Sequence, residues 1–149
     1  EKPQLIDDMV KAFGSQCVVI GVDSIAEDET YTVRSHTGTP DNMKKPGRET
    51  LHWLDEVVGR GAGEIVLNCM SADGTRAGYD IRQLSAARKA LPIPLVASGG
   101  AGEVQHFIDV FEQADVDAAL AATVFHSGQI PIPELKQELA VAGIEVRPC

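Results

Sequence analysis

The chain has 149 residues, enough for one domain with its own core, and it carries a formal net charge of -9. This acidic balance, with no basic stripe along the chain, argues against a protein that gains affinity by neutralising nucleic-acid phosphates. No apolar run approaches the roughly 18 to 20 residues of a membrane span, so we expect no membrane segment.

Helix and strand patterns alternate along the chain. Apolar residues at helical spacing behind Pro3 predict a first helix over residues 5–13, and Gly14 ends it. Residues 17–23 are then continuously apolar and β-branched up to Asp23, which is typical of a strand buried on both faces. The same order repeats three more times, with helices at 50–58, 79–91 and 103–111, strands at 64–70, 94–98 and 118–124, and a last helix at 133–142.

This alternation predicts an α/β fold of four parallel strands joined by helical crossovers, and we expect residues 1–149 to form a single unit. The two long connections, 24–47 and 71–78, both follow strands and are polar, and residues 31–35 within the first predict a small extra strand. In such folds ligands bind at the carboxyl ends of the strands. We therefore look for the functional residues there.

Two carboxylates follow predicted strands. Asp23 ends the first strand, where a carboxylate can exchange protons with a ligand lying over the rim. The alternative interpretation of Asp23 is a turn-forming aspartate. Asp73, which is followed by Gly74, has the same two interpretations, and Asp-Gly is a common turn.

A glycine-rich turn follows the third strand. At Ser98-Gly99-Gly100 the absence of side chains lets backbone N–H groups approach an anion, although glycine also serves simply to turn the chain. The sixth position of a dinucleotide motif read from Gly100 is Gln105, which excludes that motif. The next strand ends near Ala122-Thr123, and anion-friendly ends on adjacent last strands match the phosphate site of β/α barrels.

The cysteines and histidines predict neither a disulfide framework nor a metal site. Cys17, Cys69 and Cys149 are odd in number and far apart, and the histidines show no paired spacing. We therefore expect free thiols, a reducing cytoplasmic location and no metal. The chain begins at Glu1 and enters a helical pattern almost at once, as part of a longer protein would.

Several motifs occur in one order along the chain. They are Val22-Asp23, the run 60–68, Asp73-Gly74-Thr75 with Gly78-Tyr79-Asp80, the run 97–102 and the run 121–126. Together they resemble the cyclase subunit of imidazole glycerol phosphate synthase, a lyase of histidine biosynthesis. The resemblance covers only the last four strands of that family's eight and the helix before them. It therefore implies half of a (β/α)8 TIM barrel, the C-terminal half, with helices on the outer face.

The resemblance implies a known reaction. The family uses ammonia to convert a phosphoribulosyl-formimino aminoimidazole carboxamide ribonucleotide to imidazole glycerol phosphate and aminoimidazole carboxamide ribotide, without a cofactor. Two aspartates share the acid and base work, and Asp23 matches the second of them. A glutaminase subunit supplies the ammonia at the opposite mouth of the barrel, where Glu64 matches a charged ring at the entrance. The remaining matches are Ser98, Gly99, Gly100, Ala122 and Thr123 at one phosphate, Thr37 and Gly38 near the other, and Asn68 and Asp73 at substrate-facing positions.

Half a barrel would leave an apolar sheet face and two sheet edges without partners. We therefore expect this chain to pair with the missing N-terminal half or with a second copy, and to bind phosphate without turnover when alone. Two alternatives remain open. One is the sister barrel isomerase that precedes this step, and the other is a non-catalytic half-barrel module kept for assembly.

Overall fold

The computed structural model describes residues 2–147, and a five-stranded sheet in the order β2-β1-β3-β4-β5 forms its centre. The strands are β1 (Val19–Glu27), β2 (Thr30–Arg34), β3 (Glu64–Cys69), β4 (Leu95–Ser98) and β5 (Ala118–Leu120). All are parallel except β2, which pairs antiparallel to β1 at one edge. The predicted α/β unit with four parallel strands is confirmed, and so is the extra strand.

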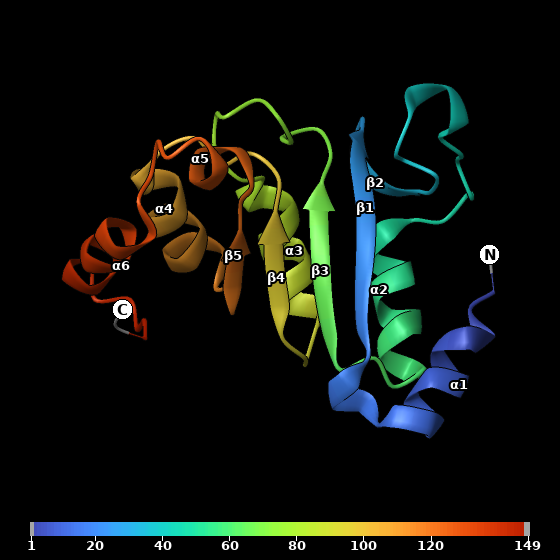
Figure 1. Ribbon diagram of the computed structural model, residues 1–149. Helices are drawn as coiled ribbons and strands as arrows, with labels where there is room; N and C mark the ends of the chain where they lie inside the picture. The colour runs from blue at the N-terminus through green and yellow to red at the C-terminus, as the bar shows by residue number, and fades with distance from the viewer. Residues whose placement is uncertain (1, 148–149) are drawn as a thin grey trace.

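The main helices cover one face of the sheet. Figure 1 shows α2 (Thr50–Gly59), α3 (Ile81–Ala90) and α4 (Val104–Ala114) behind the sheet, whose front face carries no helix among the described residues. The chain begins with α1 (Gln4–Phe13) and ends with α6 (Ile132–Val141), at opposite sides of the molecule (Figure 1). The shorter elements are the 3-10 turns Ser15–Cys17 and Pro40–Asn42 and the helix α5 (Thr123–His126).

The two faces of the sheet differ in burial, although both carry apolar residues along the strands. The residues that point toward the helices form the core, and they include Val22, Ile65, Leu67, Leu95 and Ala97. On the other face Val19 is 48% exposed and Leu120 46% exposed, and Val66 and Val96 are half-buried. We call these four residues the uncovered sheet face. The strands therefore have the composition of strands buried on both faces, but this chain covers only one.

The boundaries of β1 differ from the prediction at both ends. The strand begins at Val19 and not at residue 17, because Ser15–Cys17 forms a 3-10 turn. It continues past Asp23 to Glu27, because β2 folds back and pairs with it through a turn in which Asp28 adopts a φ of 51°. The prediction that Asp23 ends the strand was therefore wrong, and Asp23 is the last β1 residue but one to pair with β3.

The last strand is shorter than predicted. β5 ends at Leu120 and not at residue 124, and the chain turns into α5 at Thr123. The amide of His126 donates to the carbonyl of Ala122 at 2.9 Å, so local helical bonds replace sheet pairing here. As a result Ala122 and Thr123 lie at the edge of the sheet instead of within it.

The described residues, 2–147, contain neither a membrane-spanning helix nor a metal-site cluster. Within this range no helix is long and apolar enough to cross a bilayer, and no cluster of three acidic, histidine or cysteine side chains has the arrangement of a metal site. Cys17 is an exposed free thiol, while Cys69 is buried, and this burial raises the pKa of its thiol. Cys149 lies outside the described residues.

Candidate functional site

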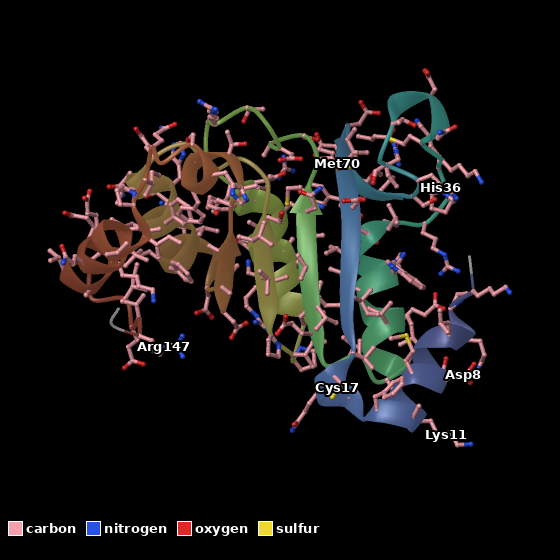
Figure 2. All side chains as sticks on the ribbon, viewed as in Figure 1. Asp8, Lys11, Cys17, His36, Met70 and Arg147 are labelled. Atoms are coloured by element: carbon pink, nitrogen blue, oxygen red, sulfur yellow. The ribbon has the colours of Figure 1, made fainter. Side chains whose placement is uncertain are left out.

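The carboxyl ends of three parallel strands bring polar side chains into one row. Asp23 on β1 is in register with Asn68 on β3, and Asn68 with Ser98 on β4, on the face without helices. The Asn68 side-chain amide donates to Asp23 Oδ1 at 2.9 Å, and Ser98 Oγ donates to Asn68 Oδ1 at 3.3 Å. Figure 2 marks this edge with Met70, which directly follows β3. The structure therefore brings these three predicted residues together.

A second donor holds the Asp23 carboxylate from the loop after β2. Thr37 Oγ1 donates to Asp23 Oδ2 at 2.5 Å, so each carboxylate oxygen accepts one hydrogen bond. Thr37 was expected near a phosphate, and the structure places its hydroxyl on the carboxylate. A carboxylate fixed in this way can give a proton to a ligand over the rim, or take one from it, without first reorienting.

The loop that carries Thr37 is tied to the β1–β2 hairpin. Backbone amides of Ser35 and Lys44 each donate to the other's carbonyl, at 3.1 and 2.8 Å. At the foot of the loop the buried Arg34 pairs with Glu27, and Lys45 Nζ donates to the same carboxylate at 2.9 Å. The hydrogen bond from Lys45 is the main cause that lowers the pKa of Glu27. The hairpin thus sets where Thr37 meets Asp23.

A cavity of about 360 Å³ opens beside this row, at the ends of β4 and β5. Gly99 and Gly100 form one wall with φ angles of 93° and 112°, in the region that favours glycine. Ala101 belongs to the same wall, and residues 120–123, where β5 ends and α5 begins, lie across from it. The lining residues include seven of the predicted site, namely Asn68, Asp73, Ser98, Gly99, Gly100, Ala122 and Thr123.

The glycine turn is interlocked with the loop after β3. The Gly78 amide donates to the Gly100 carbonyl at 2.9 Å, and a Cβ on Gly100 would lie 2.0 Å from the Gly78 carbonyl oxygen. A Cβ on Gly102 would lie 2.2 Å from the carbonyl oxygen of Arg76. Two loops can approach this closely only through glycine, so the glycines here shape the cavity as well as turning the chain.

Besides Asp23 and Thr37, which lie in the polar row, two further predicted residues do not line this cavity. Gly38 lines a separate, open hollow of about 490 Å³ together with His36, Thr39, Asn42 and Lys44. Glu64 is the first residue of β3, in register with Val19, and therefore lies at the opposite end of the sheet from Asp23. Most of the predicted residues thus gather at the carboxyl ends of the strands. Gly38 lies in a hollow of its own, and Glu64 lies at the opposite end of the sheet.

Comparison with known protein families identifies the family of this chain. Residues 1–131 match the family described as histidine biosynthesis protein. The chain belongs to this family.

Individual relatives within this family carry one name. The chain is 60% identical over 98% of its length to the imidazole glycerol phosphate synthase subunit HisF of Xanthomonas oryzae pv. oryzae. It is 59% identical to the HisF subunit of Xylella fastidiosa and 58% identical to that of Xanthomonas campestris pv. campestris, over the same share. The match covers 57% of each relative, so the chain spans little more than half their length. The resemblance seen in the sequence is confirmed, and it favours the synthase subunit over the sister isomerase.

The sequence motifs of this family left two rim residues without a role. Arg76 lines the cavity, and Tyr79 donates its hydroxyl hydrogen to the carbonyl of Leu120 at 3.0 Å, which fixes the end of β5. A lone arginine in a polar loop carries no spacing signal, and Tyr79 was used only as a family marker. The sequence did offer one signal for Tyr79, its position directly before Asp80, which caps the helix α3. In the structure its ring packs against Phe107.

We expect Tyr79 to resist ionisation in the folded chain. Burial raises the pKa of its hydroxyl, while in the unfolded chain a tyrosine ionises at about pH 10. Above that pH the unfolded state loses a proton that the folded state keeps, so stability falls as pH rises. The Tyr31→Phe variant leaves Tyr79 as the sole tyrosine, because the chain contains two. Tyrosinate absorbance should then appear only together with the loss of circular dichroism, and ionisation near pH 10 in the folded chain would contradict the burial.

Proposed function

We propose that this chain is the C-terminal part of a cyclase barrel of histidine biosynthesis. In the complete protein it would use ammonia to convert a phosphoribulosyl-formimino aminoimidazole carboxamide ribonucleotide to imidazole glycerol phosphate and aminoimidazole carboxamide ribotide. The observation that carries the proposal is the Asp23 carboxylate, held by two donors in the same polar row that borders a glycine-lined cavity. The free thiols of Cys17 and Cys69 fit a cytoplasmic location.

Each rim residue has a proposed role in this reaction. Asp23 is the acid or base contributed by this chain, and the cavity holds one phosphate of the substrate through the residues named above. Asn68 and Asp73 face the substrate between the two ends. The hollow beside Gly38, which includes Lys44, lies near the second phosphate. The geometry supports these roles because hydrogen bonds or shared cavity walls connect Asp23, Asn68 and Ser98.

The uncovered sheet face supports a structural partner. Val19, Val66, Val96 and Leu120 are apolar, and four parallel strands cannot close into a barrel. We propose that the strands present in the longer relatives, but not in this chain, cover this face and supply the second catalytic aspartate. In their absence a second copy of the chain would cover it.

A reconstitution experiment tests the proposal. The chain alone should give no ammonia-dependent turnover, and addition of a chain with the remaining HisF strands should restore it, because each half then contributes its aspartate. Val19→Lys should weaken this assembly, whereas Val141→Lys, at an 85% exposed position on α6, should not. Turnover by the pure chain, or a compact monomer at micromolar concentration in sedimentation, would contradict the proposal.

We also propose that a glutaminase subunit docks at the opposite mouth, next to Glu64. This carboxylate begins β3 at the end of the sheet away from the cavity, so a partner there would leave the substrate side open. Glu64→Lys should lower glutamine-dependent turnover of the reconstituted protein while ammonia-dependent turnover continues. Equal losses of both activities would reject this docking site.

A further inference from the structure

Arg76 has no carboxylate partner among the described residues, whereas five other arginines of the chain have one. Among residues 2–147 its guanidinium makes no hydrogen bond and no ion pair, although the chain has 22 acidic and 13 basic residues. The arginines that do pair with carboxylates are Arg34, Arg48, Arg60, Arg82 and Arg88. Arg147 has no carboxylate partner among residues 2–147 either, and of these two arginines Arg76 is the one that lines the glycine-walled cavity.

The backbone of Arg76 is held in place although its side chain is exposed. Its φ of 58° is uncommon for a residue other than glycine, and its carbonyl packs against Gly102 so closely that no Cβ fits there. The hydroxyl of Thr75 donates to the Ala72 carbonyl at 2.7 Å and accepts from the Ala77 amide at 3.2 Å. The loop thus holds the Cα of Arg76 beside the glycine turn and leaves the long side chain free to reach a ligand.

The charges that line the cavity favour an anion-binding role for Arg76. Asp73 and Arg76 are the charged residues of the lining, so their formal charges cancel. Without Arg76 the lining would be negative and would repel an anion. A guanidinium binds two phosphate oxygens at once through parallel N–H groups and carries a full positive charge, which backbone amides lack.

We propose that Arg76 closes over the phosphate in this cavity and makes the site select a doubly charged phosphate monoester over a singly charged anion. This assignment rests on the proposed phosphate site and adds a binding residue to it. The loop after β3 supplies the cation, and the turn after β4 supplies the amide groups. Together they enclose the phosphate from two sides.

Binding of inorganic phosphate, methyl phosphate and methyl sulfate to the chain tests the proposal. The amide NMR signals of residues 98–101 and 122–123 report binding at the cavity, and the remaining signals report an intact fold. Arg76→Gln should weaken methyl phosphate binding by about 10- to 100-fold, because a charged hydrogen-bond pair is lost. It should also abolish the preference for methyl phosphate over methyl sulfate. Arg76→Lys keeps the positive charge but lacks the parallel N–H groups of a guanidinium. Its loss of methyl phosphate affinity should therefore be smaller than that of Arg76→Gln.

The matched control is Arg82→Gln, which removes a 76% exposed arginine of α3 that pairs with Glu29 outside the cavity. Its binding should equal that of the unchanged chain. Equal binding by Arg76→Gln, or an equal loss in Arg82→Gln, overturns the role of Arg76 and leaves the phosphate site standing. If the signals of residues 98–101 do not respond in the unchanged chain, the phosphate site itself is rejected, and the role of Arg76 with it.

Discussion

Asp23→Asn should lower the ammonia-dependent turnover of the reconstituted protein by about 10²- to 10⁴-fold, the usual contribution of a positioned acid or base. The substitution keeps the size and shape of the side chain. The new amide oxygen can still accept from Asn68, and the new NH₂ group can donate to the Thr37 hydroxyl, which now acts as acceptor. The row of hydrogen bonds therefore survives while proton transfer is lost, so the effect falls on kcat and much less on KM.

Asp28→Asn provides the matched control for this experiment. Asp28 lies in the turn of the same hairpin, is exposed and has a φ of 51°, a conformation that asparagine tolerates as well as aspartate. Turnover of this variant should equal that of the unchanged protein. If Asp23→Asn retains more than about a tenth of the turnover, Asp23 is not the acid or base of this half.

The order of elements could be predicted from the sequence because each one has a local signal. The β-branched run before Asp23 and the apolar periodicity before Gly14 indicate a strand and a helix without knowledge of their neighbours. The continuation of β1 to Glu27 could not be predicted in this way. It depends on pairing with β2, which the four residues 24–27 do not show by themselves.

The predicted end of β5 was wrong for a related reason. Residues 118–124 are small and apolar, and nothing in their composition separates sheet pairing from the helical bonds that begin at Ala122. The same uncertainty of period does not affect β3, whose run Ile65-Val66-Leu67 consists of large apolar side chains and begins one polar residue after Gly63. Short strands at the edge of a sheet are therefore the elements that the sequence defines least.

Some residues of the candidate site could be predicted from the sequence, and other features of the site could not. Asp23, Asn68 and Ser98 follow from topology, because residues at the carboxyl ends of neighbouring parallel strands must lie at one edge. The contact between Thr37 and Asp23 crosses a long loop, and the unpaired state of Arg76 depends on where every carboxylate lies. Both are properties of the folded chain, which the sequence does not show.

Gly100→Ala should destabilise the chain by about 2 to 6 kcal/mol and remove phosphate binding at the cavity. A positive φ of 112° is strained for alanine, which costs about 1 to 3 kcal/mol. In addition the new methyl group would lie 2.0 Å from the Gly78 carbonyl oxygen, so the two loops must separate, at a cost of about 1 to 3 kcal/mol. Urea unfolding gives the free energy, and the amide signals of residues 98–101 give phosphate binding.

Gly128→Ala separates the two causes. Gly128 also has a positive φ, of 71°, but a Cβ there would meet no atom within 4 Å. This control therefore carries the backbone strain without the clash, and it should lower the unfolding free energy by about 1 to 2 kcal/mol and leave phosphate binding unchanged. Equal destabilisation by the two substitutions would mean that the loops around Gly100 yield without cost. The cavity would then not depend on the close approach of Gly78 and Gly100, and its amide groups would not be held in place for an anion.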